Sequence, residues 1–227
     1  MTLELHLHPL SSYCWKVVIA AYELGTPFEP VTVDLGDPAA RAEYLKLSPF
    51  GKIPALRDTA RGVELFETSV MIDYLDQYYP GAAPLIPADR DAARAVHLRD
   101  RIFDLYVHNV FQRIVADRFR SEGQGDAPGV EQARTQLRQA YDVLERDLEE
   151  KTWAAGESFS LADCAAAPAL FYSDLIEPIG AERPVLTAYL KRLLARPSVV
   201  RAIEEAKPFF QHYPATAEER ARLAPFG

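Results

Sequence analysis

The chain has 227 residues and is 48% hydrophobic, which is enough for one large domain or two small ones, each with its own core. Its net charge of −8 argues against general nucleic-acid binding, because such binding needs a basic surface. The longest apolar runs fall well short of the roughly 20 residues of a membrane span, and no secretory signal is recognisable. Since the two cysteines, Cys14 and Cys164, make no disulfide framework, we expect a cytoplasmic protein.

The first eighty residues alternate between strand and helix patterns. Gly25 follows the first helical run at a position that favours a left-handed residue, and Asp37-Pro38 is typical of a helix start. In chain order we expect a strand over 3–7, a helix over 12–24, a strand over 28–35, a helix over 38–47, strands over 53–57 and 62–66, and a helix over 68–79. The order βαβαββα predicts one parallel crossover followed by an antiparallel hairpin.

The second half of the chain shows only helical patterns. Residues 79–87 contain three prolines and a glycine and interrupt the preceding helix. We therefore predict a first domain over 1–79, a linker over 80–88 and an all-helical domain over 89–227. Its helices are expected over 89–120, 130–151, 161–179, 184–196 and 198–207, and the tail from 208 is short of periodic structure.

The turn between the first strand and the first helix holds the most informative residues. Thioredoxin-like proteins place a C-x-x-C motif there, but here Ser11 stands in the first cysteine's position and Cys14 in the second's. A serine hydroxyl at a helix N-terminus can donate a hydrogen bond to the thiolate of a bound thiol, and the helix dipole adds to this effect. Ser11 and Ser12 are both candidates for this donor, and helix capping is the alternative role for either.

Cys14 is expected to point inward and pack as a small apolar group, with a redox role as the alternative. His6 and His8 lie on the opposite face of the first strand from its leucines. Because no further ligand lies at suitable spacing nearby, no metal site is expected.

Two further motifs suggest contacts for an extended, charged ligand. A cis bond before Pro54 would leave the backbone of Ile53 free to pair with a peptide, although the sequence alone favours trans, and Lys52 offers a cation for a carboxylate. Glu67 can accept from an ammonium group, and Thr68 at a helix start can bind an anion.

A fourth motif, Ser160-Leu161-Ala162-Asp163, reads as a capping box that starts a helix. With these four motifs in order, the chain resembles the cytosolic glutathione transferases over nearly its full length. The family carries a catalytic Ser, Tyr or Cys after the first strand, an N-P-x-G-x-V-P segment with a cis proline, an E-S pair and an S-x-x-D capping box. The resemblance implies a thioredoxin-like α/β domain followed by a helical bundle.

The resemblance also implies roles for the residues of these motifs. Ser11, with Ser12 near it, would donate to the sulfur of glutathione, and the backbone of Ile53, beside cis-Pro54, would pair with the cysteinyl part. The remaining implied ligands are Lys52 near the glycyl carboxylate, and Glu67 and Thr68 at the γ-glutamyl end.

The thiolate would then attack an electrophilic small molecule bound between the domains of a homodimer. Tyr106 and Arg113, seven residues apart on the long helix after the linker, are our candidates for lining that pocket, with ordinary helix packing or a solvated arginine as the alternative.

The serine start is most similar to the zeta and theta-type classes. Tyr13 and Lys16 depart from the zeta pattern S-S-C-x-x-R, so zeta-type isomerisation is not predicted. Two kinds of alternative stay open. One is a catalytically silent interaction protein, like the stringent-starvation proteins that bind RNA polymerase. The other is a glutathione-dependent isomerase or thiol oxidoreductase, the latter using Cys14.

Overall fold

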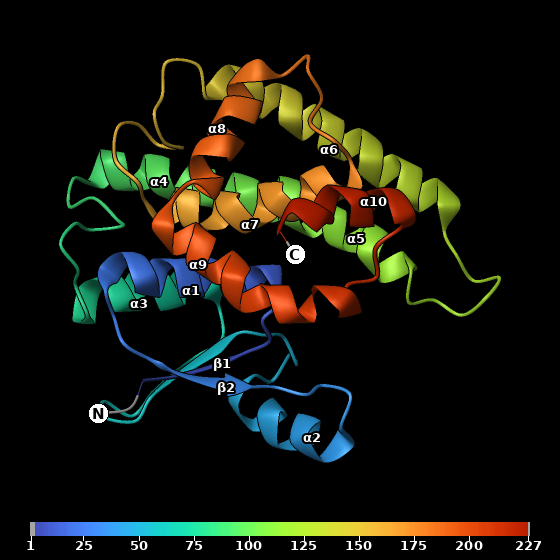
Figure 1. Cartoon of the computed structure of the whole chain (residues 1–227). Helices are drawn as coiled ribbons and strands as arrows, with labels where there is room; N and C mark the ends of the chain where they lie inside the picture. Colours follow the sequence, from blue (N-terminus) through green and yellow to red (C-terminus); the bar gives the residue numbers. More distant parts are fainter. Residues whose placement is uncertain (1–2, 227) are drawn as a thin grey trace.

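The computed structural model describes residues 3–226. Its N-terminal domain contains a mixed four-stranded sheet in the order β2-β1-β3-β4 (Figure 1). The strands are β1 (Leu3–Leu7), β2 (Glu29–Thr32), β3 (Ala55–Asp58) and β4 (Val63–Leu65). β1 pairs in parallel with β2, while β1–β3 and β3–β4 are antiparallel, as the element order predicts.

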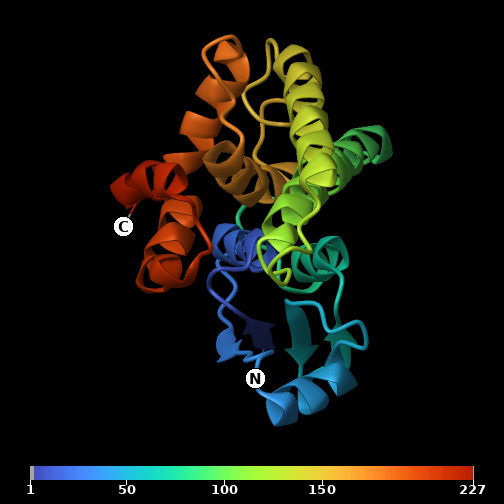
Figure 2. The ribbon, with the colours of Figure 1, turned by 90° about the vertical axis from the view of Figure 1, so that its right-hand side faces the viewer.

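Helices cover both faces of this sheet. α1 (Ser12–Leu24) and α3 (Thr68–Tyr78) lie between the sheet and the C-terminal helices, whereas α2 (Pro38–Leu47) lies on the opposite face (Figures 1 and 2). α1 is therefore enclosed on both sides, and it is apolar almost all round and largely buried. Its position makes α1 the element that joins the two domains.

The expected second strand, 28–35, is longer than the observed β2. β2 is an edge strand, which tolerates Pro30 because a missing N–H on the outer side breaks no ladder. The chain still donates one further bond after the strand, from the Val33 N–H to the Leu7 carbonyl at 2.9 Å.

Residues 79–89 contain no helix or strand, and helices follow. They are α4 (Arg90–Ile102), η1 (Phe103–His108), α5 (Asn109–Asp117), α6 (Ala127–Asp147), α7 (Leu161–Ile176), α8 (Pro184–Leu194), α9 (Pro197–Ala206), η2 (Lys207–His212), α10 (Ala217–Leu223) and η3 (Ala224–Phe226). α7 runs through the middle of this bundle (Figure 1) and is almost entirely buried. The domain limits at 1–79 and 89–227 stay a prediction.

The capping box predicted for α7 is confirmed: the Asp163 carboxylate accepts from the backbone N–H of Ser160 at 2.9 Å. That carboxylate also accepts from Ala154 N–H and from the Tyr189 hydroxyl, at 2.8 and 2.7 Å. The start of α7 is thus tied to the loop before it and to α8.

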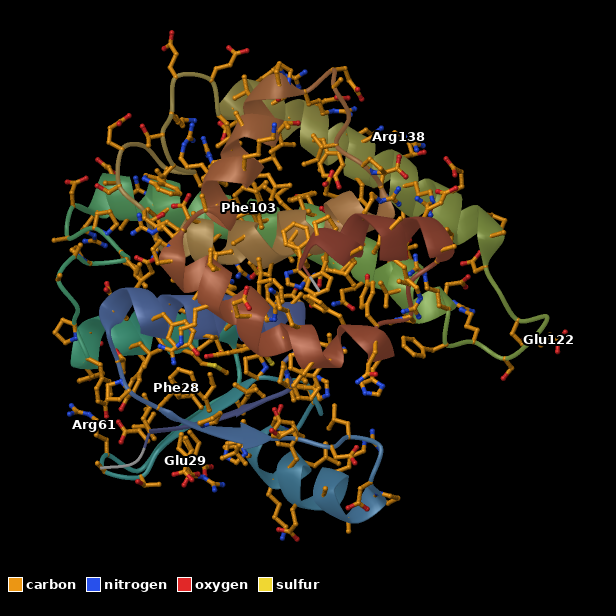
Figure 3. All side chains as sticks on the ribbon, viewed as in Figure 1. Phe28, Glu29, Arg61, Phe103, Glu122 and Arg138 are labelled. Carbon is orange, nitrogen blue, oxygen red and sulfur yellow. The ribbon has the colours of Figure 1, made fainter. Side chains whose placement is uncertain are left out.

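Two expectations for the helical half were wrong in detail. The helix expected over 89–120 ends at Asp117 and contains a π-helical stretch, η1, whose Phe103 packs in the centre of the bundle (Figure 3). The tail expected to lack periodic structure contains α10, which starts with a Thr216–Glu219 capping box. Glu219 also forms a buried ion pair with Arg118, 2.6 Å apart, so a tertiary contact stabilises a helix too short to show a period.

None of the helices within residues 3–226 combines the length and the apolarity that crossing a bilayer requires.

Candidate active site

Ser11 is the N-cap of α1. Its Oγ accepts a hydrogen bond from the Cys14 N–H at 3.4 Å, a distance at which the cap is weak. The side chain is half-exposed, and four N–H groups of the first helical turn lie beside it. A bound anion could therefore reach both the hydroxyl and the positive end of the helix dipole.

Ser12, one residue further on, points into the protein instead. It is only 2% exposed, and its Oγ lies 2.5 Å from His108 Nε2 and accepts from Gln112 Nε2 at 3.1 Å. The hydroxyl of Ser12 is thus engaged by the C-terminal domain, and Ser11 is the more accessible of the two serines.

Cys14 is buried, as expected for a packing role. Burial raises the pKa of its thiol to about 12, although hydrogen bonds from Ser11 and the His8 backbone act in the opposite direction. A thiol with such a pKa stays protonated at neutral pH, and the thiolate is the reactive form. This environment gives no support to the redox alternative.

The loop before β3 is held by two hydroxyl groups. Tyr44 and Ser48 both donate to the Lys52 carbonyl, at 2.6 and 2.8 Å, and the Ile53–Pro54 peptide bond is cis, as the family resemblance implies. Within the described part of the chain, neither the N–H nor the C=O of Ile53 has a hydrogen-bond partner. These groups remain available to an extended peptide ligand, and the exposed Lys52 stands next to them.

Glu67 and Thr68 lie where α3 begins. Glu67 is the N-cap residue but makes no capping bond with its exposed side chain, and Thr68 is 8% exposed. The first N–H groups of α3 therefore lack a side-chain cap, which leaves them free for a carboxylate. An ammonium group on the same ligand would have the Glu67 carboxylate beside it.

A buried ionic cluster that sequence reasoning missed links α1, α3, α4 and η1. The Nζ of Lys16 lies 2.6 Å from Asp100, 2.8 Å from Asp104 and 3.0 Å from the Ser69 hydroxyl, and Arg101 contacts both carboxylates. Burial tends to raise the pKa of each carboxyl. Lys16 and Ser69 nevertheless hold the pKa of Asp100 below its ordinary value, whereas burial and the neighbouring Asp100 charge raise the pKa of Asp104. The spacing of Asp100 and Asp104, four residues apart in a helical pattern, was the sequence signal that could have indicated this cluster.

The candidates for the second pocket do not meet. Tyr106 is 60% exposed on η1, while Arg113 on α5 donates to Gln136 of α6. The side chains that face the start of α1 from this region are instead His108, Asn109 and Gln112, which the sequence analysis did not identify. Asn109 accepts from the Tyr13 hydroxyl at 2.8 Å.

A cavity of about 620 Å³ lies on the other flank of α1, bordered by β2 and α9. Cys14, Trp15 and Phe28 line it, but Ser11, Ile53 and Glu67 do not. Figure 3 shows Phe28 below α1, near α9. The presumed ligand groups therefore do not belong to this cavity.

The fold defines a class: two-domain proteins with a thioredoxin-like first domain and a helical second domain. Residues 5–83 match the family profile described as glutathione S-transferase, N-terminal domain, and residues 102–197 match that of the C-terminal domain. The chain belongs to the glutathione S-transferase family.

Individual relatives agree with this assignment. A glutathione S-transferase of Silene vulgaris is 30% identical over 210 residues, covering 87% of this chain and 95% of the relative. Glutathione S-transferase 3 of Zea mays is 34% identical over 215 residues, 88% of this chain and 93% of the relative. Among solved structures, a glutathione S-transferase from Methylobacillus flagellatus with GSH bound has a TM-score of 0.80 and 28% identity, covering 88% of this chain and 98% of that one.

One further relative is not named as a glutathione S-transferase. A stringent starvation protein A homolog of Haemophilus influenzae is 26% identical over 198 residues, which cover 86% of this chain and 87% of the relative.

Proposed function

We propose that this protein is a serine-type glutathione transferase, in which the hydroxyl of Ser11 stabilises the thiolate of bound glutathione. The single observation that carries the proposal is the position of Ser11: a half-exposed, weakly bonded hydroxyl at the N-terminus of α1. The hydroxyl of the neighbouring Ser12 is buried and already hydrogen-bonded to His108 and Gln112, which favours Ser11 as the donor to the thiolate.

In this proposal glutathione lies across three segments of the N-terminal domain. Its cysteinyl backbone pairs with the free N–H and C=O of Ile53, and Lys52 attracts the glycyl carboxylate. At the other end, Glu67 accepts from the γ-glutamyl ammonium while Thr68 and the uncapped N–H groups of α3 bind the carboxylate. Each end of the tripeptide thus meets a group of opposite charge.

The chemistry needs only a stabilised thiolate. The thiol of glutathione loses its proton to solvent, and the Ser11 O–H and the α1 dipole lower the pKa for this step. A shift of two units from 8.5 makes the thiolate the major form at pH 7, for about 2.7 kcal/mol. The sulfur then forms a bond to an electrophilic carbon of an apolar small molecule. In a substitution a leaving group departs with the bonding electron pair; in an addition to an enone the resulting enolate takes up a proton from solvent.

The second substrate would bind beside the sulfur, between the domains. Tyr106 on η1 is exposed and can contribute apolar surface, whereas Arg113 is already bonded to Gln136. We keep both as proposed pocket residues and expect Tyr106 to matter more.

We also propose a cytoplasmic homodimer. Large apolar side chains are exposed at Val70 and Tyr78 of α3, at Leu98 of α4 and at Phe50, with exposed fractions of 50%, 41%, 53% and 75%. Exposed apolar residues on neighbouring helices are a common feature of protein interfaces. Light scattering at micromolar concentration tests this: a mass near 25.4 kDa would mean a monomer.

Calorimetry with glutathione and turnover of a panel of aryl halides and enones test the function. We expect binding at millimolar concentration or tighter, followed by conjugation. If no glutathione binds, the proposal is wrong. If glutathione binds normally but no electrophile turns over, the silent interaction protein is the better description, which is the alternative favoured by the similarity to the stringent starvation protein A homolog.

A further inference from the structure

His108 is a buried histidine that the proposed chemistry does not use. It ends η1 and is fully buried, with its ring stacked between Tyr13, 3.6 Å away at 7°, and Phe111, 5.0 Å away at 17°. Burial, with a smaller contribution from Lys16, holds the pKa of its imidazole well below the ordinary value, so the ring is uncharged at neutral pH. This uncharged ring contacts Ser12, the residue directly after Ser11.

The contact joins the C-terminal domain to the first turn of α1. His108 Nε2 lies 2.5 Å from the Oγ of Ser12, and Gln112, four residues later on the same helix face, donates to the same oxygen at 3.1 Å. Next to it, the Tyr13 hydroxyl donates to Asn109. Ser12 and Tyr13 are the two residues that follow Ser11, so three side chains from η1 and α5 fix the turn that carries it.

Either tautomer of His108 can make this contact. Within residues 3–226, Nδ1 is buried and has no hydrogen-bond partner. With the proton on Nε2, His108 donates to the Ser12 oxygen; with the proton on Nδ1, the Ser12 hydroxyl donates to Nε2. In both cases the Ser12 hydroxyl is held by two side chains, His108 and Gln112.

The π-helical stretch explains how His108, Asn109 and Gln112 come together. A π turn contains one residue more than an α turn and changes the direction of the side chains that follow, and such turns often occur at functional sites. In this chain η1 ends at His108, and α5 supplies Asn109 and Gln112 directly after it. The irregular stretch thus lies where the two domains meet at the start of α1.

We propose that His108 is a positioning residue for thiol activation: through its hydrogen bond with Ser12, it fixes the first turn of α1 and so holds the Ser11 hydroxyl and the turn's N–H groups in line with the sulfur. This inference rests on the proposed function. It assigns Ser12 a role as the receiver of this contact rather than as a second donor to the thiolate.

Two substitutions at one position separate positioning from packing. The amide group of Gln reaches the place of the histidine Nε2 and can donate or accept, so His108→Gln keeps a hydrogen-bond partner for Ser12, whereas His108→Leu removes it. The readouts are the ultraviolet absorbance of bound glutathione thiolate against pH and the pH profile of kcat/KM. We expect His108→Leu and Ser12→Ala to raise the apparent pKa of bound glutathione by about one unit, roughly a tenfold loss of thiolate below that pKa, with the KM for glutathione little changed.

Under the proposal, His108→Gln stays close to wild type in both readouts. The proposal is overturned if His108→Leu and Ser12→Ala ionise glutathione like wild type, or if the Gln and Leu variants shift its pKa equally. Circular dichroism first establishes that each variant folds, and Ser12→Ala with Gln112→Ala tests the same contact should His108→Leu fail to fold. A wild type that binds glutathione but does not ionise it would overturn the proposed function itself, which separates the two failures.

Discussion

The two ends of α1 are both held by the C-terminal domain, but by different kinds of contact. At its N-terminal end Lys16 is fully buried between Asp100 and Asp104, and Ser12 meets His108. At its C-terminal end Glu23 accepts two bonds from Arg196, at 2.7 and 2.8 Å, and one from Ser198. The Arg196 side chain there is 31% exposed.

This difference separates two functions of one helix. Charges at the N-terminal end lie in a low dielectric, where an unpaired partner is very costly, and they surround the turn that carries Ser11. Charges at the C-terminal end are partly solvated and lie a whole helix away from that turn. We therefore expect both ends to contribute to stability and only the N-terminal end to influence chemistry.

The largest effect is expected for Lys16→Met. Removing this ammonium leaves two buried carboxylates without their main partner, and breaking a buried pair in this way costs about 3–5 kcal/mol of unfolding free energy. Urea unfolding measures it. The control is Lys46→Met, whose ion pair with Glu43 is more than 70% exposed on both sides and should cost less than about 0.5 kcal/mol. If the two variants lose similar amounts of unfolding free energy, burial does not determine what these two ion pairs contribute to stability.

A smaller effect is expected for Glu23→Gln. The pKa of Glu23 is lowered because hydrogen bonds from Arg196 and Ser198 outweigh the effect of burial. A carboxyl with a lowered pKa stabilises the fold above its ordinary value of 4.5, and this contribution disappears as the pH falls through the folded-state pKa. At pH 7 we expect a loss of about 1–2 kcal/mol with unchanged conjugation activity.

The loss of unfolding free energy in Glu23→Gln, relative to wild type, should be smaller near pH 3 than at pH 7. As a control, Arg94→Ala breaks an exposed pair with Asp91 and should change stability by no more than about 0.5 kcal/mol. Loss of glutathione ionisation in Glu23→Gln would show that the two ends of α1 are not separable.

The last effect appears only below neutral pH: it is an acid sensitivity from His108. Since its pKa is lowered in the folded state, the folded protein cannot take up the proton that the unfolded chain binds below about pH 6.5. Stability should be complete above that pH and fall by up to about 1.4 kcal/mol per pH unit below it. Unfolding of wild type and His108→Gln between pH 7 and 5 measures the difference. His97→Gln, at an exposed position of α4, should keep the wild-type dependence; if all three proteins respond alike, His108 is not the source.

The sequence was sufficient where structure follows from local chemistry. The N-terminal element order, the left-handed Gly25 with φ 67°, the Asp37 cap and the capping box at Ser160 all rest on residues close together in the chain. These features also placed Ser11, Lys52, Ile53 and Glu67 on the segments that could form one binding surface.

Sequence reasoning could not supply contacts that only the tertiary fold creates. Ser12 and His108 are 96 residues apart, and no pattern in either segment indicates the other. Choosing between Ser11 and Ser12 depends on the rotation of a helix start, where a shift of one residue turns a side chain from solvent to core. The π-helical stretch has no periodic signature of its own, so the sequence could not place it within the helix after the linker.

The most direct test of the account is the ionisation of glutathione bound to wild type, Ser11→Ala and Ser12→Ala, followed by thiolate absorbance against pH. We predict an apparent pKa about two units below the free value of roughly 8.5 in wild type, a return nearly to that value in Ser11→Ala, and about half that change in Ser12→Ala. A wild-type pKa retained in Ser11→Ala would contradict the central role of this hydroxyl.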